Sequence, residues 1–425
     1  MPRFKVGLNI QSLLTPLKMK AIITIGSILL FSTSCQFPSK ETRIVGPRLS
    51  EMAVPCREGG EPNLYVSNDG HLYLSWVEYL DDSTDALKYS VLEKGSWSAP
   101  KTISKGTDWF VNWADFPSLT SFRDGGKTLA THWLQKSEKG TYDYDVHIAL
   151  STDSGESWGV SFIPHTDGIP AEHGFVSLVP VSKDRVFAVW LDGRNTNLGS
   201  GKDRGAMTLR TAEFDQNGNL FEEAELDNRT CDCCQTSAAM TAEGPIVAYR
   251  NRSEEEIRDI AYVRKVNGQW TDPKILFPDH WEIAGCPVNG PSVVAEGKEV
   301  TIAWFSRATG QSEVKIAFSN DAGATFSNPV RIDDGKPLGR VDVLLLEPGK
   351  ALVSWLEDTK EGGRIRAVKV NSSGKEGNSV TLTQTSTSRQ SGFPILAKSG
   401  KRIFLAWTQV NDDKTTVKTA EVIWD

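Results

Sequence analysis

The sequence lacks the features that mark a membrane-spanning or a nucleic-acid-binding protein. After residue 35 it has no apolar run long enough for a transmembrane helix, which needs about 20 apolar residues. It also has no excess of positive charge, because 47 Lys and Arg residues stand against 54 Asp and Glu residues, a net charge of −7. A nucleic-acid-binding surface needs a basic face. We therefore expect no nucleic-acid partner.

The N-terminal region contains one apolar stretch of 14 residues, from Ala21 to Ser34, which ends at Cys35. This length is too short to span a bilayer and is typical of the apolar region of a signal peptide. The small residues before Cys35 resemble a bacterial lipobox. We expect residues 1–35 to be a signal peptide, with Met19 as an alternative start, and Cys35 to carry lipid; an ordinary secretory signal is the alternative. This predicts an exported cell-envelope protein, an outer-membrane lipoprotein.

An aromatic residue recurs near the end of seven apolar segments. The seven aromatic residues are Trp76, Trp133, Trp190, Tyr249, Trp304, Trp355 and Trp407. Successive members lie 51 to 59 residues apart. A fixed period of this length is the signature of a repeat architecture.

The pattern of each repeat predicts four short strands separated by glycine and Asp/Asn turns. In the first repeat we expect strands at residues 63–68, 72–80, 86–94 and 98–104. Short antiparallel strands at this period predict the radial blades of a β-propeller. The fold class is therefore all-β, a propeller of seven four-stranded blades in one domain over residues 36–425, with a six-bladed ring as the alternative.

The last repeat is one strand short. After Trp407 only one more strand, residues 415–423, precedes the end of the sequence. The segment between the signal peptide and the first repeat, residues 42–54, is available as the missing outer strand. Such pairing joins the two ends of the ring and removes an open sheet edge.

Two segments, residues 151–158 and 319–326, share the pattern S-x-D-x-G-x-[ST]-[WF], and both follow the third strand of a repeat. Glycine favours positive φ and an aspartate carboxylate accepts backbone N–H groups, so the pattern predicts a tight turn closed by an aromatic side chain. A shorter copy occurs at residues 267–270. We expect Asp153 and Asp321 to be structural.

This pattern is the Asp-box, and the chain resembles the sialidase superfamily of Asp-box, or BNR-repeat, propellers over its whole mature length. The resemblance implies that the boxes lie on the face opposite the active site. It also implies an exo-acting hydrolase that releases terminal sialic acid from glycans. Three arginines of the family hold the sugar carboxylate, an aspartate is the acid/base, and a tyrosine paired with a glutamate is the nucleophile. Family sialidases have six blades.

The loops before the first strands, here called leading loops, and those after the second strands lie on one face of a propeller. There the candidate catalytic carboxyl groups are Asp115, Asp192 and Glu357, with Glu172 as a further candidate. The resemblance makes Asp115 the acid/base. The candidate substrate-binding residues are Arg194, Arg250, Arg252, Arg307, Arg340 and Arg389. The structural alternative is a solvated funnel whose charges pair with one another.

Two positions depart from the sialidase pattern. Glu61 stands where the family has the arginine of its Arg-Ile-Pro motif, and no tyrosine follows Tyr262 as a late nucleophile. Two alternatives are therefore open: a glycosidase that uses two carboxyl groups, and a non-catalytic propeller that binds a glycan or protein through Trp109, Trp113 and the arginines. In each case we expect a monomer with a glycan or glycoprotein ligand, in contact with the membrane only through its lipid anchor.

Beyond Cys35 the chain has five cysteines: Cys56, Cys231, Cys233, Cys234 and Cys286. The cluster of three and Cys286 belong to the leading loops of neighbouring repeats. A disulfide from Cys286 to the cluster is the first expectation in an oxidising compartment, and a strained Cys233–Cys234 bridge is a second. The alternative is a site for zinc or copper(I), which His173 or His132 would complete, in a metal- or thiol-dependent propeller.

Overall fold

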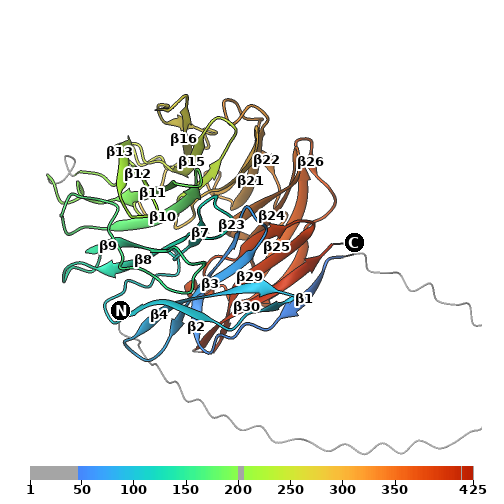
Figure 1. Ribbon diagram of the computed structural model, residues 1–425. Helices are drawn as coiled ribbons and strands as arrows, with labels where there is room; N and C mark the ends of the chain where they lie inside the picture. Colours follow the sequence, from blue (N-terminus) through green and yellow to red (C-terminus); the bar gives the residue numbers. More distant parts are fainter. Residues whose placement is uncertain (1–45, 200–204, 413, 425) are drawn as a thin grey trace, which may run out of the picture. The chain divides into compact units, whose positions relative to one another are not determined.

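The computed structural model describes residues 46–199, 205–412 and 414–424. In this part of the chain the strands form seven antiparallel sheets, which follow one another in chain order (Figure 1). The seven-bladed propeller predicted from the repeated aromatic residues is confirmed, and the six-bladed alternative is wrong. The predicted signal peptide and Cys35 lie outside the described residues. Among the described residues no helix is long and apolar enough to cross a membrane.

Blades 1 to 3 use the first half of the chain. Blade 1 consists of β2 (Gly59–Val66), β3 (Leu72–Tyr79), β4 (Asp85–Glu93), β5 (Ser96–Trp97) and β6 (Lys101–Gly106). Blade 2 consists of β7 (Leu119–Ser121), β8 (Leu129–Lys136) and β9 (Tyr144–Ser151). Blade 3 consists of β10 (His173–Pro180), β11 (Val186–Asp192), β12 (Thr208–Phe214) and β13 (Leu220–Asp227).

Blades 4 to 6 continue the same order. Blade 4 consists of β14 (Ser237–Met240), β15 (Pro245–Arg250), β16 (Ile260–Val266), β17 (Gln269–Trp270) and β18 (Lys274–Ile275). Blade 5 consists of β19 (Ser292–Glu296), β20 (Glu299–Ser306), β21 (Glu313–Ser319) and β22 (Val330–Arg331). Blade 6 consists of β23 (Pro337–Glu347), β24 (Lys350–Thr359), β25 (Gly362–Asn371), β26 (Gly374–Lys375) and β27 (Val380–Thr385).

Blade 7 joins the two ends of the described chain. A short 3₁₀ turn, η2 (Arg389–Ser391), leads into β28 (Ile395–Ser399), β29 (Arg402–Asn411) and β30 (Lys414–Ile423). The outer strand is β1 (Arg48–Met52), which pairs antiparallel with β30. The predicted closure by an N-terminal strand is therefore confirmed. The N-terminal strand β1 and the C-terminal strands β28 to β30 form one sheet. This pairing closes the ring and leaves β30 without an open edge.

The outer strands depart from the predicted pattern. In blade 1 the strand expected at residues 98–104 is β6, which begins at Lys101, and the two-residue strand β5 lies before the expected range. Pro100 lies in the break and has no N–H group to donate to the ladder. Blade 2 has three strands, and its outer position is held by a single bridge between Phe162 and Ile148.

The hydrophobic core consists of seven clusters, each shared by two neighbouring blades. Trp190, for example, packs with Phe122 and Val146 of blade 2, whereas Trp76 of blade 1 packs with Phe404 of blade 7. The seven repeated aromatic side chains are 0 to 4 % exposed. Their burial between the sheets explains why the second strand of every repeat is almost continuously apolar.

Candidate functional site on the leading-loop face

The first strands of blades 1, 3 and 6 begin with a bulge. Register shifts occur between Gly60 and Asn63 in β2, Gly174 and Ser177 in β10, and Gly339 and Asp342 in β23. Each bulge contains one residue with positive φ, and these residues are Glu61 (51°), Phe175 (55°) and Arg340 (54°). Left-handed backbone in a non-glycine residue costs of order 1–3 kcal/mol and is concentrated at functional sites. The leading-loop face is therefore the first place to look for function.

A cavity of about 290 Å³ lies at the axis, lined by all seven first strands. Phe116 and Phe393 belong to its lining, and their rings are 5.6 Å apart. Trp113 stacks on Phe393 at 6.0 Å, and the guanidinium of Arg340 lies 4.8 Å from the Trp113 ring. This arrangement gives the axis an aromatic wall between blades 2 and 7. Apolar walls with a few oriented polar groups are typical of ligand sites.

A buried acid cluster joins the leading loops of blades 2 and 3. The Tyr144 hydroxyl donates to Glu172 Oε1 at 2.9 Å and lies 3.4 Å from Asp115 Oδ2. The backbone N–H of Phe175 donates to Asp115 Oδ1 at 2.7 Å. Gly174 permits this contact, because a Cβ there would lie 2.1 Å from Asp115 Oδ2. Asp115 is 1 % exposed, so its carboxyl group acts on solvent or ligand only through its neighbours.

Glu172 is the half-buried member of the acid cluster. Burial raises the pKa of Glu172 to about 7, and the charge of Asp232 adds to the rise. Asp232 follows Cys231 in the leading loop of blade 4, and burial raises its pKa as well, against the opposing charge of Arg252. Two carboxyl groups with altered proton affinity therefore lie in adjacent leading loops. Such groups are candidates for proton transfer.

Asp192 and Glu357, two of the predicted catalytic residues, are partners of the repeated tryptophans. Trp190 Nε1 donates to Asp192 Oδ2 at 2.8 Å, and Trp355 Nε1 donates to Glu357 Oε2 at 3.3 Å. The same two-residue spacing joins Trp76 to Glu78, Trp133 to Gln135 and Trp407 to Gln409. Because five blades share this contact, its first role is to satisfy a buried indole N–H.

Five of the six predicted arginines already have partners. All three guanidinium nitrogens of Arg250 donate to backbone carbonyls, at 2.6 to 2.9 Å. Arg340 donates to Ser391 Oγ and to two carbonyl oxygens. Arg194 binds Asp192 in a bidentate pair at 2.7 Å.

Arg252 is the fourth of these arginines, and it contacts Glu256 and Asp232. Arg307 and Arg389 are exposed, and Arg307 Nε donates to the Gly310 carbonyl oxygen at 3.3 Å. Arg389 lies close enough to Arg340 for its charge to add to burial in lowering the pKa of Arg340 to about 10. Among the described residues the Arg389 side chain makes no ion pair, so it is available to an anionic group on this face.

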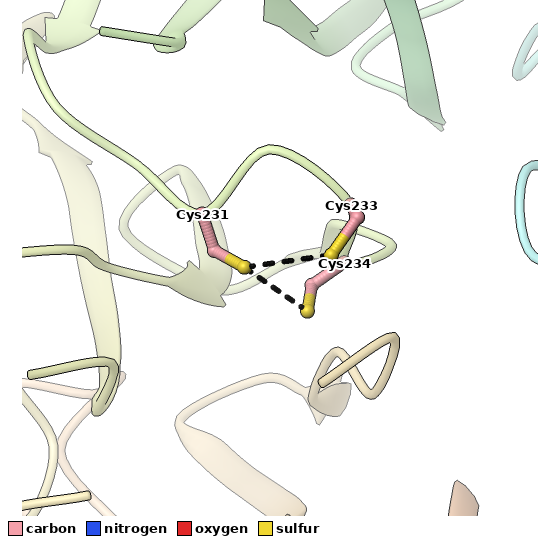
Figure 2. A group of neighbouring side chains, drawn as sticks. All are labelled: Cys231, Cys233 and Cys234. Atoms are coloured by element: carbon pink, nitrogen blue, oxygen red, sulfur yellow. Dashed lines mark hydrogen bonds between the residues drawn. The ribbon is translucent and has the colours of Figure 1, made fainter. Parts of the chain in front are cut away.

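The clustered cysteines bring their sulfur atoms together in the leading loop of blade 4 (Figure 2). Cys231 Sγ lies 3.8 Å from Cys233 Sγ and 3.4 Å from Cys234 Sγ. Cys286, from the leading loop of blade 5, lies close enough to Cys233 for the two thiols to shift each other's pKa. Arg258 Nη1 donates to Cys231 Sγ at 3.2 Å. Hydrogen bonds from Cys233 and Cys234, together with the Arg258 charge, hold the pKa of Cys231 well below its ordinary value.

The expected disulfides are not formed, because Cys56, Cys231, Cys233, Cys234 and Cys286 all carry free thiols. The predicted proximity of Cys286 to the cluster is nevertheless present. The histidines do not join the sulfur atoms. His132 Nδ1 lies 3.1 Å from Ser118 Oγ in blade 2, and His173 stacks on His165 at 3.8 Å.

Sequence reasoning missed several residues of this face. Tyr144 joins Asp115 to Glu172, Asp232 supplies a second carboxyl group, and His165 packs against His173. Tyr144 begins a third strand and His165 lies in the link between blades 2 and 3, and neither position belongs to the loops that topology assigns to this face. The position of Asp232 between Cys231 and Cys233 was the one signal available in the sequence.

Comparison with known proteins gives similarity of fold. No family model and no curated sequence matches the chain. A protein of unknown function from Dyadobacter fermentans superposes with a TM-score of 0.52 at 14 % identity, over 90 % of this chain and all of that one.

Other solved structures that resemble the chain carry the names of glycan-acting enzymes. An α-L-arabinofuranosidase from Fusarium graminearum has a TM-score of 0.48 at 13 % identity and covers 89 % of this chain and 97 % of its own. The sialidase of Trypanosoma rangeli has a TM-score of 0.47 at 9 % identity and covers 77 % of this chain and 56 % of its own. At these identities the likeness concerns the propeller fold alone.

Proposed function

We propose that this chain acts on glycans as an exo-glycosidase, with Glu172 as the proton donor on the leading-loop face. The observation that carries the proposal is the Glu172 carboxyl group, whose pKa is raised to about 7 and which is oriented by the Tyr144 hydroxyl. A carboxylic acid that retains its proton near neutral pH can protonate a glycosidic oxygen. Asp115 acts as a positioning residue, because it contacts Tyr144 and the bulge at Phe175.

Asp232 is the proposed second carboxyl group of the reaction. Its charge acts on Glu172, and Arg252 Nη1 contacts both of its oxygens at 3.2 Å. A glycosidase needs one carboxyl group that donates a proton and one that activates water or attacks the sugar. The aromatic wall of Trp113 and Phe393 provides an apolar surface for a sugar ring on the same face.

The proposed substrate is a glycan with a terminal acidic sugar, and sialic acid is the first to test. Arg389 is exposed beside Arg340 and is free to pair with a sugar carboxylate. Turnover of an aryl sialoside in preference to neutral aryl glycosides, with a higher KM in Arg389→Ala, is the expected result. Preference for a neutral sugar would overturn the sialidase assignment and leave the broader glycosidase proposal standing.

The decisive experiment compares Glu172→Gln with Glu156→Gln, a control at an exposed glutamate of the 151–158 turn. We expect Glu172→Gln to lower kcat by about 10²- to 10⁴-fold and Glu156→Gln to leave it unchanged. In the unmodified protein kcat/KM should fall as the pH rises through about 7, because Glu172 then loses its proton. Unchanged activity of Glu172→Gln would refute its role, and absence of turnover on every glycoside would refute the enzymatic proposal.

The observation that favours a second function is the spacing of the sulfur atoms. Two thiolates bound at about 2.3 Å to one tetrahedral zinc ion lie about 3.8 Å apart, and the Cys231 contacts are 3.4 and 3.8 Å. We propose a zinc or copper(I) centre that joins the leading loops of blades 4 and 5. Metal analysis of protein purified without chelator should give one ion per chain, and Cys233→Ser/Cys234→Ser should lose it. Metal content unchanged by this double substitution would refute the centre.

We also propose that the protein is exported and lipidated at Cys35. The support is the apolar stretch of residues 21–34 that ends at this cysteine. Labelling with a radioactive fatty acid in a bacterial host should give a labelled band that Cys35→Ser abolishes. Equal labelling of both proteins would contradict the proposal.

A further inference from the structure

Two buried histidines lie against each other where blade 2 meets blade 3. His165, from the link between the blades, stacks on His173, the first residue of β10, with ring centroids 3.8 Å apart and planes 9° from parallel. The two side chains are 4 % and 0 % exposed. Two positive charges at this separation in a buried site repel each other strongly. The stacked pair therefore favours one proton charge, and the neighbours of each ring determine which ring carries it.

His173 is the charged ring of the pair. Its Nδ1 donates to the Tyr144 carbonyl oxygen at 3.3 Å and lies 3.4 Å from Asp145 Oδ1. Its Nε2 faces Asp167 Oδ2 at 3.4 Å and Asp192 Oδ1 at 3.7 Å. Burial alone would lower the pKa of His173, but the hydrogen bond to Asp145 and the nearby carboxylates outweigh burial and raise this pKa. Because both nitrogens face only acceptors, an imidazolium fits this position.

His165 is the neutral ring, and one of its nitrogens lacks a donor. Burial and the charge of His173 lower the pKa of His165 to about 4. Its Nδ1 lies 3.2 Å from Asp167 Oδ2, an oxygen that Arg194 Nη2 holds at 3.1 Å, so Nδ1 carries the proton. The lone pair is then on Nε2, which makes no hydrogen bond within the described chain and lies 3.7 Å from Asp145 Oδ1. Two acceptors therefore face each other with no donor between them.

The ionic groups around the stacked rings leave one negative charge unbalanced. Three carboxylates stand against two cations, a sum of −1, and the five groups are Asp145, Asp167, Asp192, Arg194 and His173. Glu223 and Arg210, the next ion pair outward from Arg194, offset each other. An uncompensated charge is costly when it is partly buried. The group that would complete this site is therefore a monovalent cation that donates hydrogen bonds.

A cavity of about 230 Å³ leads to the side of His165 that lacks a donor. Asp145 and His165 line this cavity, whereas Asp167, which faces the protonated nitrogen of His165, is not part of the lining. The exposed Glu138 adds a second carboxylate. An apolar part of the lining comes from Ile163, Ile169 and Pro170. Apolar walls with a few oriented polar groups are typical of small-molecule sites.

We propose that this cavity binds a small aliphatic primary amine in its protonated form. An ammonium group carries one positive charge and three N–H donors, so it suits Asp145, Glu138 and His165 Nε2 together. The alkyl chain of the amine packs against the apolar part of the lining. The stacked rings do not suit a metal ion, because their lone pairs lie in parallel planes and His173 Nδ1 already donates to a carbonyl oxygen. The inference is independent of the proposed glycosidase activity, because its test is binding alone.

The experiment is a ligand-observed NMR titration of the full chain with butylammonium chloride at neutral pH. Two comparison ligands separate the features that are recognised. Tetramethylammonium keeps the charge but has no N–H donor, and butanol keeps the alkyl chain but has no charge. We expect saturable binding of butylammonium and binding of both comparison ligands that is weaker by about tenfold or more.

Substitutions in the lining locate the site. Asp145→Asn removes the carboxylate that faces His165 and should weaken butylammonium binding by about tenfold or more. Ile169→Lys places an ammonium group of the chain itself in the cavity and should abolish binding, and because Ile169 is 40 % exposed the fold should be retained. Glu138→Gln should weaken binding by about threefold. Glu156→Gln, at an exposed glutamate of the 151–158 turn, is the control and should leave binding unchanged.

Circular dichroism of each variant separates loss of binding from loss of fold. If Asp145→Asn does not fold, Ile169→Lys and Glu138→Gln decide the question, because both substitutions are at solvent-accessible positions. Failure of butylammonium to bind would overturn the proposal and leave the cavity to solvent. Equally strong binding of tetramethylammonium or butanol would also overturn it, as would binding that is unchanged in both Ile169→Lys and Glu138→Gln.

Discussion

The ends of the second strands and the leading loops of blades 2 to 4 lie on the same face, yet they differ in how completely their polar atoms are paired. At the strand ends a buried indole such as that of Trp190 donates to a side chain two residues later. In the leading loops and the links before them, Nε2 of His165 and His173 makes no hydrogen bond within the described chain, and the clustered thiols form no disulfide. Burial also raises the pKa of Glu172 and Asp232.

The difference separates groups that recur in the blades from groups that occur once. A recurring contact such as the indole hydrogen bond stabilises five of the blades and needs no ligand. The acid cluster, the thiols and the stacked histidines each occur in one place, and each contains polar atoms that water, a proton or a ligand must satisfy. We therefore assign the ring's stability to the recurring residues and its chemistry to the irregular ones, and the variants below test that division.

The largest effect is expected from Trp190→Ala. The side chain is 0 % exposed and packs between blades 2 and 3, so its removal should lower the free energy of unfolding by about 3–5 kcal/mol. Urea denaturation measures the change. Tyr142→Ala is the control, because Tyr142 is 53 % exposed and should change stability by about 0.5 kcal/mol or less. Equal effects of the two substitutions would contradict the assigned role of the repeated aromatics.

Arg250→Met should have the next largest effect, although Arg250 was predicted to bind substrate. Its side chain is 2 % exposed, and the substitution leaves the carbonyl groups of Asn289, Arg258 and Phe305 without their donor. We expect a loss of about 3 kcal/mol. The exposed Arg307 provides the matched control, Arg307→Met. If Arg250→Met changed substrate affinity but not stability, the result would contradict this structural role and would support a role in substrate binding.

The fold was predictable from sequence because every blade of a propeller repeats the same pattern of apolar strands and one large aromatic residue. Seven aromatics at similar spacing gave the blade count, and the strand missing after Trp407 indicated the closure that β1 provides. The strand ends were less predictable, because bulges such as that at Glu61 extend the first strand beyond its alternating pattern.

The site was less predictable because it depends on contacts between loops far apart in sequence. The sequence placed Asp192 and Arg250 on the correct face but did not show that an indole and three carbonyls occupy them. Tyr144 and His165 lie outside the segments that topology assigns to the axis, so their contacts with Glu172 and His173 required the structure. The sequence pattern predicts the face on which a side chain lies, whereas the partners of that side chain depend on how the loops pack together.

A moderate effect that depends on pH is expected from Glu61→Gln. Burial raises the pKa of Glu61 to about 7 in the folded protein, above its ordinary value in the unfolded chain. Its contribution to stability is therefore fully present below the unfolded pKa and is lost as the pH rises through about 7. Relative to the unmodified protein, Glu61→Gln should gain on the order of 2 kcal/mol between pH 5 and pH 8. Urea midpoints at both pH values measure this, and parallel pH profiles would contradict the buried, protonated state.

The smallest effect is expected on the opposite face, in the turn of residues 319–326. Asp321 accepts hydrogen bonds from the Thr325 N–H and hydroxyl at 2.9 and 2.6 Å, and Gly323 has a φ of 81°. Asp321→Ala should cost about 1 kcal/mol, whereas substitution of the exposed Asp272 should cost less. Both proteins should retain the metal content and glycan turnover of the unmodified protein, because the turn is on the face away from the leading loops. A loss of turnover in Asp321→Ala at unchanged stability would refute the division between the two groups, since a recurring turn would then take part in the chemistry.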